Sequence, residues 1–172
     1  TWTFFTIEKF DWSEKLVGYS LGFIGLLAAI VQGGLIRVII PKLGNIKSVY
    51  FGMIFYIIGL SLFSFAEEGW MVFAFAIPLS LGGISGPALQ GIMTNKIPDD
   101  EQGEFQGGMT SLVSLTAIIG PLLMTNLFSY FTSENSFYYF PGAPFLVGAI
   151  ISFFGLIIAV RFLSGSRGGS SI

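Results

Sequence analysis

The feature that most constrains this chain is the length of its uncharged stretches. Five segments contain no Asp, Glu, Lys or Arg. A helix rises about 1.5 Å per residue, so roughly 20 mostly apolar residues cross the hydrocarbon core of a bilayer. All five segments reach that length. We therefore predict five transmembrane helices, over residues 16–36, 48–66, 69–95, 105–133 and 135–160.

Both ends of the chain differ from these spans. Residues 1–7 are apolar and run directly into the charged Glu8 and Lys9, so we interpret them as the end of a sixth membrane helix and the chain as a fragment of a longer protein. Residues 164–172 are rich in Gly and Ser, which predicts a flexible tail. The long unbroken runs lack the alternation of barrel strands, so the expected fold is an all-α, polytopic membrane protein.

Composition excludes several classes of function. Only 10% of the residues are charged, and the eight basic ones are scattered, so we expect no nucleic-acid partner. The chain contains neither cysteine nor histidine, which removes the commonest metal ligands and the usual acid/base catalyst. No phosphate-binding glycine loop is present. We expect no metal, no cofactor and no enzymatic activity.

The basic residues between the spans predict the orientation of the chain, because Lys and Arg are retained on the cytoplasmic side. When alternate loops are grouped, six basic residues fall on one side and only Lys9 and Lys15 on the other. We therefore expect a protein of the inner membrane with its C-terminus in the cytoplasm. The six residues are Arg37, Lys42, Lys47, Lys96, Arg161 and Arg167.

Small residues and prolines inside the spans indicate how the helices meet. Helices in lipid associate through small residues, which predicts close packing at Gly18 with Gly22, Gly82 with Gly86, and Gly103 with Gly107. A small and polar stripe on the fourth span has the same packing interpretation. Proline removes a backbone hydrogen bond, so kinks or breaks are expected at three positions. The stripe is Gly107, Ser111, Ser114, Pro121 and Thr125, and the prolines are Pro78, Pro87 and Pro121.

Polar side chains inside the spans are the candidates for a substrate pathway. Gln32 lies five residues before Arg37 and Gln90 six before Lys96, so both amides sit at a similar depth. A buried amide in hydrocarbon needs a partner or water. We hypothesise that they line a cytoplasm-facing cavity; an interhelical hydrogen bond that only fixes packing is the alternative. The candidate pathway residues are Gln32, Tyr56, Gln90 and Ser114.

One short motif permits a different class of function. Residues 83–86, Gly-Ile-Ser-Gly, match the sequence around the nucleophile of rhomboid-type intramembrane proteases. Such a serine needs a base within hydrogen-bond reach, and this chain has no histidine. Ser85 is thus either a nucleophile whose base comes from outside this sequence or a packing residue.

A set of motifs carries a resemblance to a known family. The most specific are Gly82-Gly83-Ile84 with residues 87–90 (PALQ), residues 100–103 (DEQG) with Gln106-Gly107, and residues 119–123 (IGPLL). From about Phe10 to Gly148 the chain resembles the C-terminal half of a major facilitator superfamily transporter, in the drug:proton antiporter branch that includes bacterial tetracycline exporters.

The resemblance implies a twelve-helix fold in which these spans are helices eight to twelve, with an N-terminal half of the same protein as partner. Lys42, Gly44 and Lys47 resemble the superfamily's cytoplasmic gate motif, although Pro41 stands where an acidic residue is expected. The matched motifs also imply a structural role for five residues, Pro87, Gly103, Gly107, Gly120 and Pro121.

The resemblance also implies a function, which is proton-coupled export of small amphipathic molecules, with tetracycline as one candidate. Two titratable residues of tetracycline exporters are replaced. Tyr56 stands in place of a membrane-embedded aspartate, and Ala28 in place of a histidine. A non-transporting receptor or scaffold on the same fold is the alternative that this loss favours.

Overall fold

A computed structural model describes residues 1–133 and 136–165, and within them every regular element is helical. The tail prediction falls mostly on residues 166–172, which lie outside the described residues. In chain order the elements are α1 (Trp2–Phe10), α2 (Glu14–Ile30), the π-helix η1 (Val31–Leu35), α3 (Ile36–Leu43), α4 (Asn45–Ser64), α5 (Gly69–Gly82), α6 (Ser85–Thr94), α7 (Gln102–Thr132) and α8 (Ala143–Gly165).

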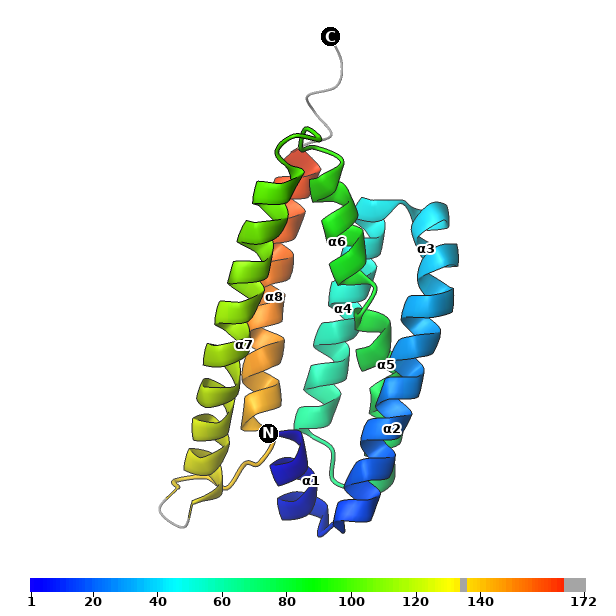
Figure 1. The fold of residues 1–172 in the computed structure, drawn as a ribbon. Helices are drawn as coiled ribbons and strands as arrows, with labels where there is room; N and C mark the ends of the chain where they lie inside the picture. Colours follow the sequence, from blue (N-terminus) through cyan, green and yellow to red (C-terminus); the bar gives the residue numbers. More distant parts are fainter. Residues whose placement is uncertain (134–135, 166–172) are drawn as a thin grey trace.

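These elements form five helices that are long and apolar enough to cross a membrane. They are α2 with η1 and α3, then α4, then α5 with α6, then α7, then α8. In Figure 1 the five run side by side along one axis, with α1 lying at the end opposite the α3–α4 turn. The predicted all-α class with five spans is confirmed.

Short polar signals set the ends of the helices. Asp11 ends α1 in the left-handed conformation at φ 50°, and Ser13 begins α2 by accepting a hydrogen bond from the Leu16 amide at 3.4 Å. Gly44 alone separates α3 from α4, at φ 77°, where a side chain would be strained. Residues with these conformational preferences let consecutive spans reverse within a few positions.

The third span is broken where the sequence predicted irregularity. α5 ends at Gly82 and α6 begins at Ser85, with Gly83 and Ile84 forming a turn. The Gly83 amide bonds the Ser80 carbonyl at 3.0 Å, a tighter i to i+3 pattern. Pro87 has no amide hydrogen to continue the α-helical ladder back to Gly83. The break therefore falls between Pro78 and Pro87, whereas the helix around Pro121 is continuous.

The last span begins later than predicted. Residues 135–160 are free of charge, but α8 starts only at Ala143 and continues through Arg161. Pro141 and Pro144 explain the start, because proline is tolerated in the first turn of a helix and interrupts the ladder further in. Lack of charge is thus no sign that residues 136–142 are helical.

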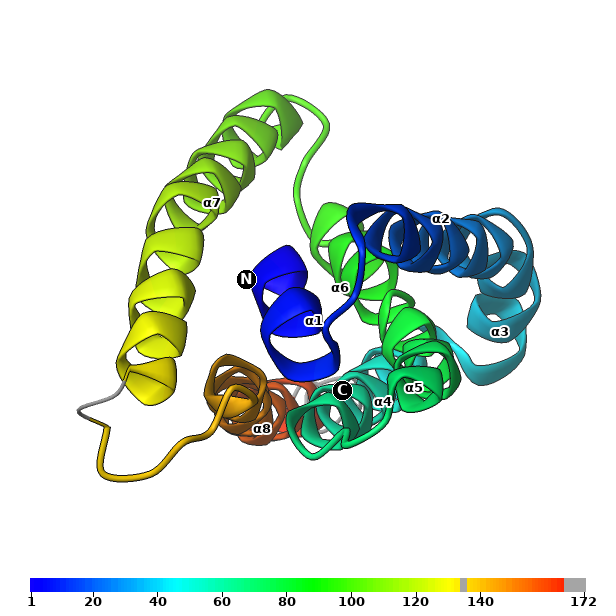
Figure 2. The ribbon, with the colours of Figure 1, turned by 90° about the horizontal axis from the view of Figure 1, so that it is seen from below.

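Helix α4 lies at the centre of the packing and contacts α5, α6 and α8. Its contacts with α5 and α6 are made through glycine: a Cβ on Gly59 would lie 2.7 Å from the Leu79 backbone, and one on Gly52 would lie 2.5 Å from the Ser85 amide nitrogen. Close backbone approach through small residues is the usual interface of membrane helices. Figure 2 shows α7 standing apart from this group, with α8 beside one of its ends.

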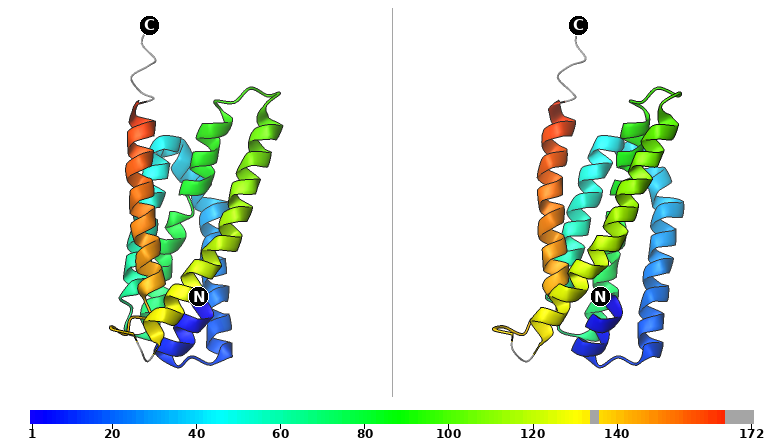
Figure 3. Two further views of the ribbon diagram at one scale, coloured as in Figure 1. Left: turned by 90° about the vertical axis from the view of Figure 1, so that its left-hand side faces the viewer. Right: turned by 60° about the vertical axis from the view of Figure 1, so that its left-hand side comes forward.

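The largest cluster of buried side chains lies at the α1 end of the bundle. Phe63 and Val72 are almost fully buried there, and Trp2 packs edge-on against Phe63 with ring centroids 5.1 Å apart. Phe145 of α8 joins the same group, at 5.8 Å from Phe63. The side views of Figure 3 show that α1 is short and reaches only this end. α1 therefore closes one end of the bundle.

Candidate functional site

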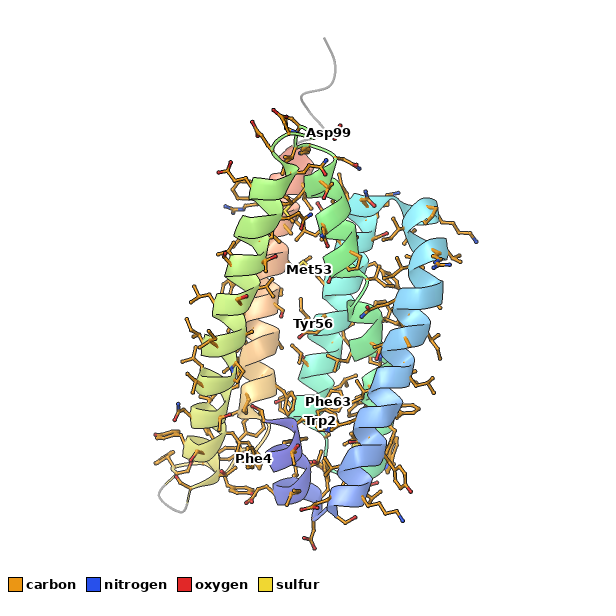
Figure 4. All side chains as sticks on the ribbon, in the orientation of Figure 1. Trp2, Phe4, Met53, Tyr56, Phe63 and Asp99 are labelled. Carbon is orange, nitrogen blue, oxygen red and sulfur yellow. The ribbon has the colours of Figure 1, made fainter. Side chains whose placement is uncertain are left out.

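Two of the predicted pathway residues lie against the break in the third span. Tyr56 of α4 lies against Gly82, where an added Cβ would be 2.6 Å from the Tyr56 Cβ. On the other side, the Gln32 Nε2 would lie 3.9 Å from a Cβ on Gly83. Figure 4 places Tyr56 midway along the bundle, between Met53 and Phe63. Residues from α4 and η1 are thus brought together at one irregular piece of backbone.

The backbone around Gln32 is itself irregular. Val31–Leu35 form a π-helix, which widens the turn and leaves α-helical hydrogen bonds unmade. Gly33 and Gly34 lie within it, and a Cβ on either would meet nothing within 4 Å. The sequence analysis did not predict this element. The Gly-Gly pair was the signal available, but in a helix such a pair does not specify a π turn.

Gln90 has a different environment from Gln32. It lies on α6, and its Nε2 donates to Gln106 Oε1 of α7 at 3.4 Å. Both helices would otherwise have little contact near this point. This bond supports the packing interpretation of Gln90. Its partner, Gln106, was not among the predicted site residues.

Ser114 lies on α7 together with the rest of the predicted small and polar stripe, and the stripe is not covered. Ser111 donates to the Gly107 carbonyl at 2.9 Å, which is a bond within the helix. A Cβ on Gly103, Gly107 or Gly120 would meet nothing within 4 Å. Ser114 and Pro121 are exposed. No described helix packs on this face.

The predicted glycine pairs also include both closely packed and uncovered residues. Gly82 packs closely against α4, but its partner Gly86 has open space around it, as do Gly18 and Gly22 on α2. Within the described residues no helix meets Gly18, Gly22, Gly103 or Gly107, so close packing at these two pairs stays a prediction. The close contacts are made instead by the glycines of α4 and by Gly82, because α4 has neighbours on both sides.

The region that resembles the gate motif forms a tight turn beside a cavity of about 390 Å³. Gly44 and Lys47 line it from the start of α4, and Asn95 and Lys96 line it from the end of α6. Lys42 is exposed on the last turn of α3. Two lysines, Lys47 and Lys96, thus lie at one opening.

Ser85 lies in a packing environment. Its Oγ donates to the Gly82 carbonyl at 2.8 Å, within the turn that begins α6. Its backbone faces Gly52 of α4 at close range. Pro87, two positions further on, is exposed in the first turn of α6. The geometry gives no support to the protease hypothesis.

Comparison with known proteins agrees with this arrangement. A family model described as Major Facilitator Superfamily matches residues 1–171. The class C tetracycline resistance protein of Escherichia coli is 35% identical over 150 residues, covering 87% of this chain and 37% of that protein. The class E protein of Escherichia coli is 37% identical over 166 residues, covering 96% of this chain and 40% of the relative.

More distant relatives extend beyond bacteria. Hippocampus abundant transcript-like protein 1 of Bos taurus is 28% identical over 171 residues, covering 91% of this chain and 34% of that protein. No solved structure gives a significant match. The chain thus spans about two fifths of the length of its bacterial relatives. Its helices and its match over residues 1–171 together show that it belongs to the Major Facilitator Superfamily.

Proposed function

We propose that this chain is the C-terminal half of a twelve-helix secondary transporter that exports small amphipathic molecules and is driven by the proton gradient. The observation that carries the proposal is the similarity, at 33–37% identity, to tetracycline resistance proteins over most of the chain. Tetracycline is the first candidate substrate. The protein would work by alternating access rather than as an enzyme, with the substrate between the two halves.

The uncovered polar faces support a partner half. The α7 stripe around Ser114 and the glycines of α2 have no neighbour within the described residues. Polar groups exposed to hydrocarbon are costly, so such faces suit a second bundle or a water-filled path. Gln32 and Tyr56 lie near the break and would meet substrate there, while the Lys42 to Lys47 turn would close against the other half.

The proton carrier would belong to the N-terminal half. The five uncharged segments contain no Asp, Glu or His. By the resemblance to tetracycline exporters, Tyr56 and Ala28 stand where those proteins have titratable residues. This half would shape the path. We further propose the inner membrane and a cytoplasmic C-terminus, on the six-to-two bias of basic residues between the loops.

Flux measurements test the function. The complete transporter in proteoliposomes should move tetracycline, or another amphipathic compound of a panel, only when a pH gradient is imposed. Replacing Gln32 and Gln90 together by Leu should alter the transport kinetics if both line the path. A panel in which no compound responds to the gradient would contradict the proposal and favour the scaffold alternative.

Cysteine labelling tests the partner half separately. The chain has no cysteine, so single replacements give a clean background. The labelling of Ser114→Cys by a water-soluble maleimide should change when the N-terminal half is co-expressed, because that half replaces lipid on this face by protein or by water. Ser164→Cys, at the exposed end of α8, should react in both states, and the fully buried Ser48→Cys in neither. Unchanged labelling of Ser114→Cys would argue against a partner on this face.

A further inference from the structure

A cavity of about 270 Å³ lies at the α1 end of the bundle, away from the break and from Ser114 of the α7 stripe. Three segments meet there: the end of α1, the turn between α4 and α5, and the segment that precedes α8. Eight described residues line it. They are Lys9, Ser64, Phe65, Glu67, Tyr138, Tyr139, Phe140 and Pro141.

Two opposite charges face this cavity. Lys9 and Glu67 interact through space, but within the described residues they form no ion pair. Burial lowers the pKa of Lys9, and the Glu67 carboxylate opposes that shift. A half-buried ammonium that is not paired with a carboxylate lacks part of its solvation. The Lys9 Nζ lies 5.8 Å from the centroid of the Phe5 ring, a cation–π contact that leaves the ammonium without a carboxylate partner.

One residue that lines the cavity has an unsatisfied hydroxyl. Ser64 is fully buried, and its Oγ has no hydrogen-bond partner within the described residues. Gly142 lies so close to the Ser64 carbonyl that no side chain would fit there, which holds the segment before α8 against the end of α4. A buried polar group without a partner costs free energy. A ligand that offered a polar atom to Ser64 would recover that cost.

The walls are aromatic and held in place. The Tyr139 hydroxyl donates to Glu8 Oε1 at 3.1 Å, and burial together with this bond raises the pKa of Tyr139. Phe140 packs between Phe65 and Tyr138, with centroid distances of 5.9 and 6.3 Å. Such rings contact apolar groups and attract ammonium groups through their faces.

We propose that this cavity binds a small zwitterion, a molecule with an ammonium group and an acidic group close together. The acidic group would bond Lys9 and Ser64, and the ammonium group would bond Glu67 and the aromatic faces. A simple anion is disfavoured because Glu67 lines the same cavity as Lys9, and a simple cation would meet Lys9. Pockets for drug-sized ligands measure about 300–1,000 Å³, so the occupant is smaller than a drug.

Binding of three related probes tests the charge requirement. The protein in nanodiscs of phosphatidylglycerol should bind L-phenylalanine saturably, and bind phenylacetate and phenethylamine at least about tenfold more weakly, since each lacks one charge-assisted bond. Equal binding of all three probes, or no saturable binding of L-phenylalanine, would overturn the proposal. Flux is not measured, so failure here leaves the transport proposal untouched.

Paired variants locate the site. Lys9→Met and Glu67→Gln should each weaken L-phenylalanine binding by about tenfold. Their controls, Lys15→Met and Glu68→Gln, remove the same charges from neighbouring positions that do not line the cavity and should leave binding unchanged. Equal losses from variants and controls would contradict the assignment.

Ser64→Ala separates binding from folding. The hydroxyl has no partner, so its removal should weaken L-phenylalanine binding without lowering the melting temperature. A loss of stability with unchanged binding would assign Ser64 a structural role and count against the site.

A change of lipid identifies the source of the zwitterion. Phosphatidylethanolamine carries an ammonium and a phosphate in its head group, the same pair of charges. If L-phenylalanine binds more weakly in nanodiscs of this lipid than in nanodiscs of phosphatidylglycerol, the lipid head group competes for the site, which supports the proposal with a lipid as occupant. Unchanged binding would support it with a free solute as occupant.

Discussion

The most apolar windows of helices α4 and α7 have the same mean hydropathy, yet the two helices lie in opposite surroundings. About a third of the most apolar window of α4 is buried inside the structure, at 33%, against 6% for α7. α4 buries Gly52, Gly59 and Phe63 among others, whereas α7 buries only Phe128. The difference teaches that hydropathy marks both as membrane helices, while neighbours decide which of them is a structural centre.

The strongest way to break this comparison is to open a cavity beside α4. Phe63→Ala removes a fully buried ring that contacts Trp2, Phe75 and Phe145, and should cost about 3 kcal/mol, the lower end of the range for such changes. The lower end applies because the side chains of an unfolded chain in detergent remain in apolar surroundings. Little transfer free energy is then lost, and most of the cost comes from the cavity that the missing ring leaves. Denaturant titration in mixed micelles measures it.

The matched change on α7 is Tyr130→Ala, where the side chain is 63% exposed. It should alter the free energy of unfolding by no more than about 0.5 kcal/mol, as for other exposed positions. Similar losses from the two variants would mean that α7 is as deeply packed as α4.

Replacing glycine by alanine should change stability in opposite directions on the two helices. Gly59→Ala places a Cβ 2.7 Å from the backbone of Leu79, and backbone cannot move aside easily, so it should cost about 1–3 kcal/mol. Gly107→Ala on α7 meets nothing within 4 Å and should stabilise the helix by up to about 1 kcal/mol. Melting temperatures in one detergent compare the two. A stabilising Gly59→Ala would show that α4 and α5 are further apart than the structure has them.

A small effect is also expected for the hydrogen bond that joins α6 to α7. Gln90→Leu removes the bond to Gln106, and should cost about 0.6 kcal/mol, the average for hydrogen bonds between membrane helices. Asn126→Leu on α7 is the control, because Asn126 bonds only the Leu122 carbonyl of its own helix, at 2.8 Å. A double variant with Gln106→Leu should add nothing further to Gln90→Leu, and additive losses would contradict a direct bond.

The candidate site was partly readable from the sequence. Prolines 78 and 87 predicted a discontinuous third span, and the break lies between them. Gln32 and Tyr56 were selected as polar groups inside apolar segments, without any sign that both lie beside Gly82 and Gly83. Their proximity depends on the offset between α2, α4 and α5, which no local pattern encodes. Gln106 was missed as the partner of Gln90 for the same reason.

The start of α8 shows a second limit. Residues 136–142 are as free of charge as a membrane helix, but Tyr138, Tyr139 and Phe140 lie in the segment that lines the zwitterion cavity. A count of charges cannot separate an aromatic segment outside a helix from the helix that follows. The two prolines, read for their missing amide hydrogens, place the boundary better than hydropathy does.

The sequence by itself determined the number of spans, the all-helical class and the family resemblance. Each follows from local quantities, because every backbone group in lipid must be satisfied within a helix and charges must stay outside the hydrocarbon. The tertiary structure alone decided that α4 is packed and α7 is uncovered, although the mean hydropathy of their most apolar windows is the same. Lipid and protein interior are equally apolar, so only close approach at glycines such as Gly59 distinguishes a helix that faces helices from one that does not.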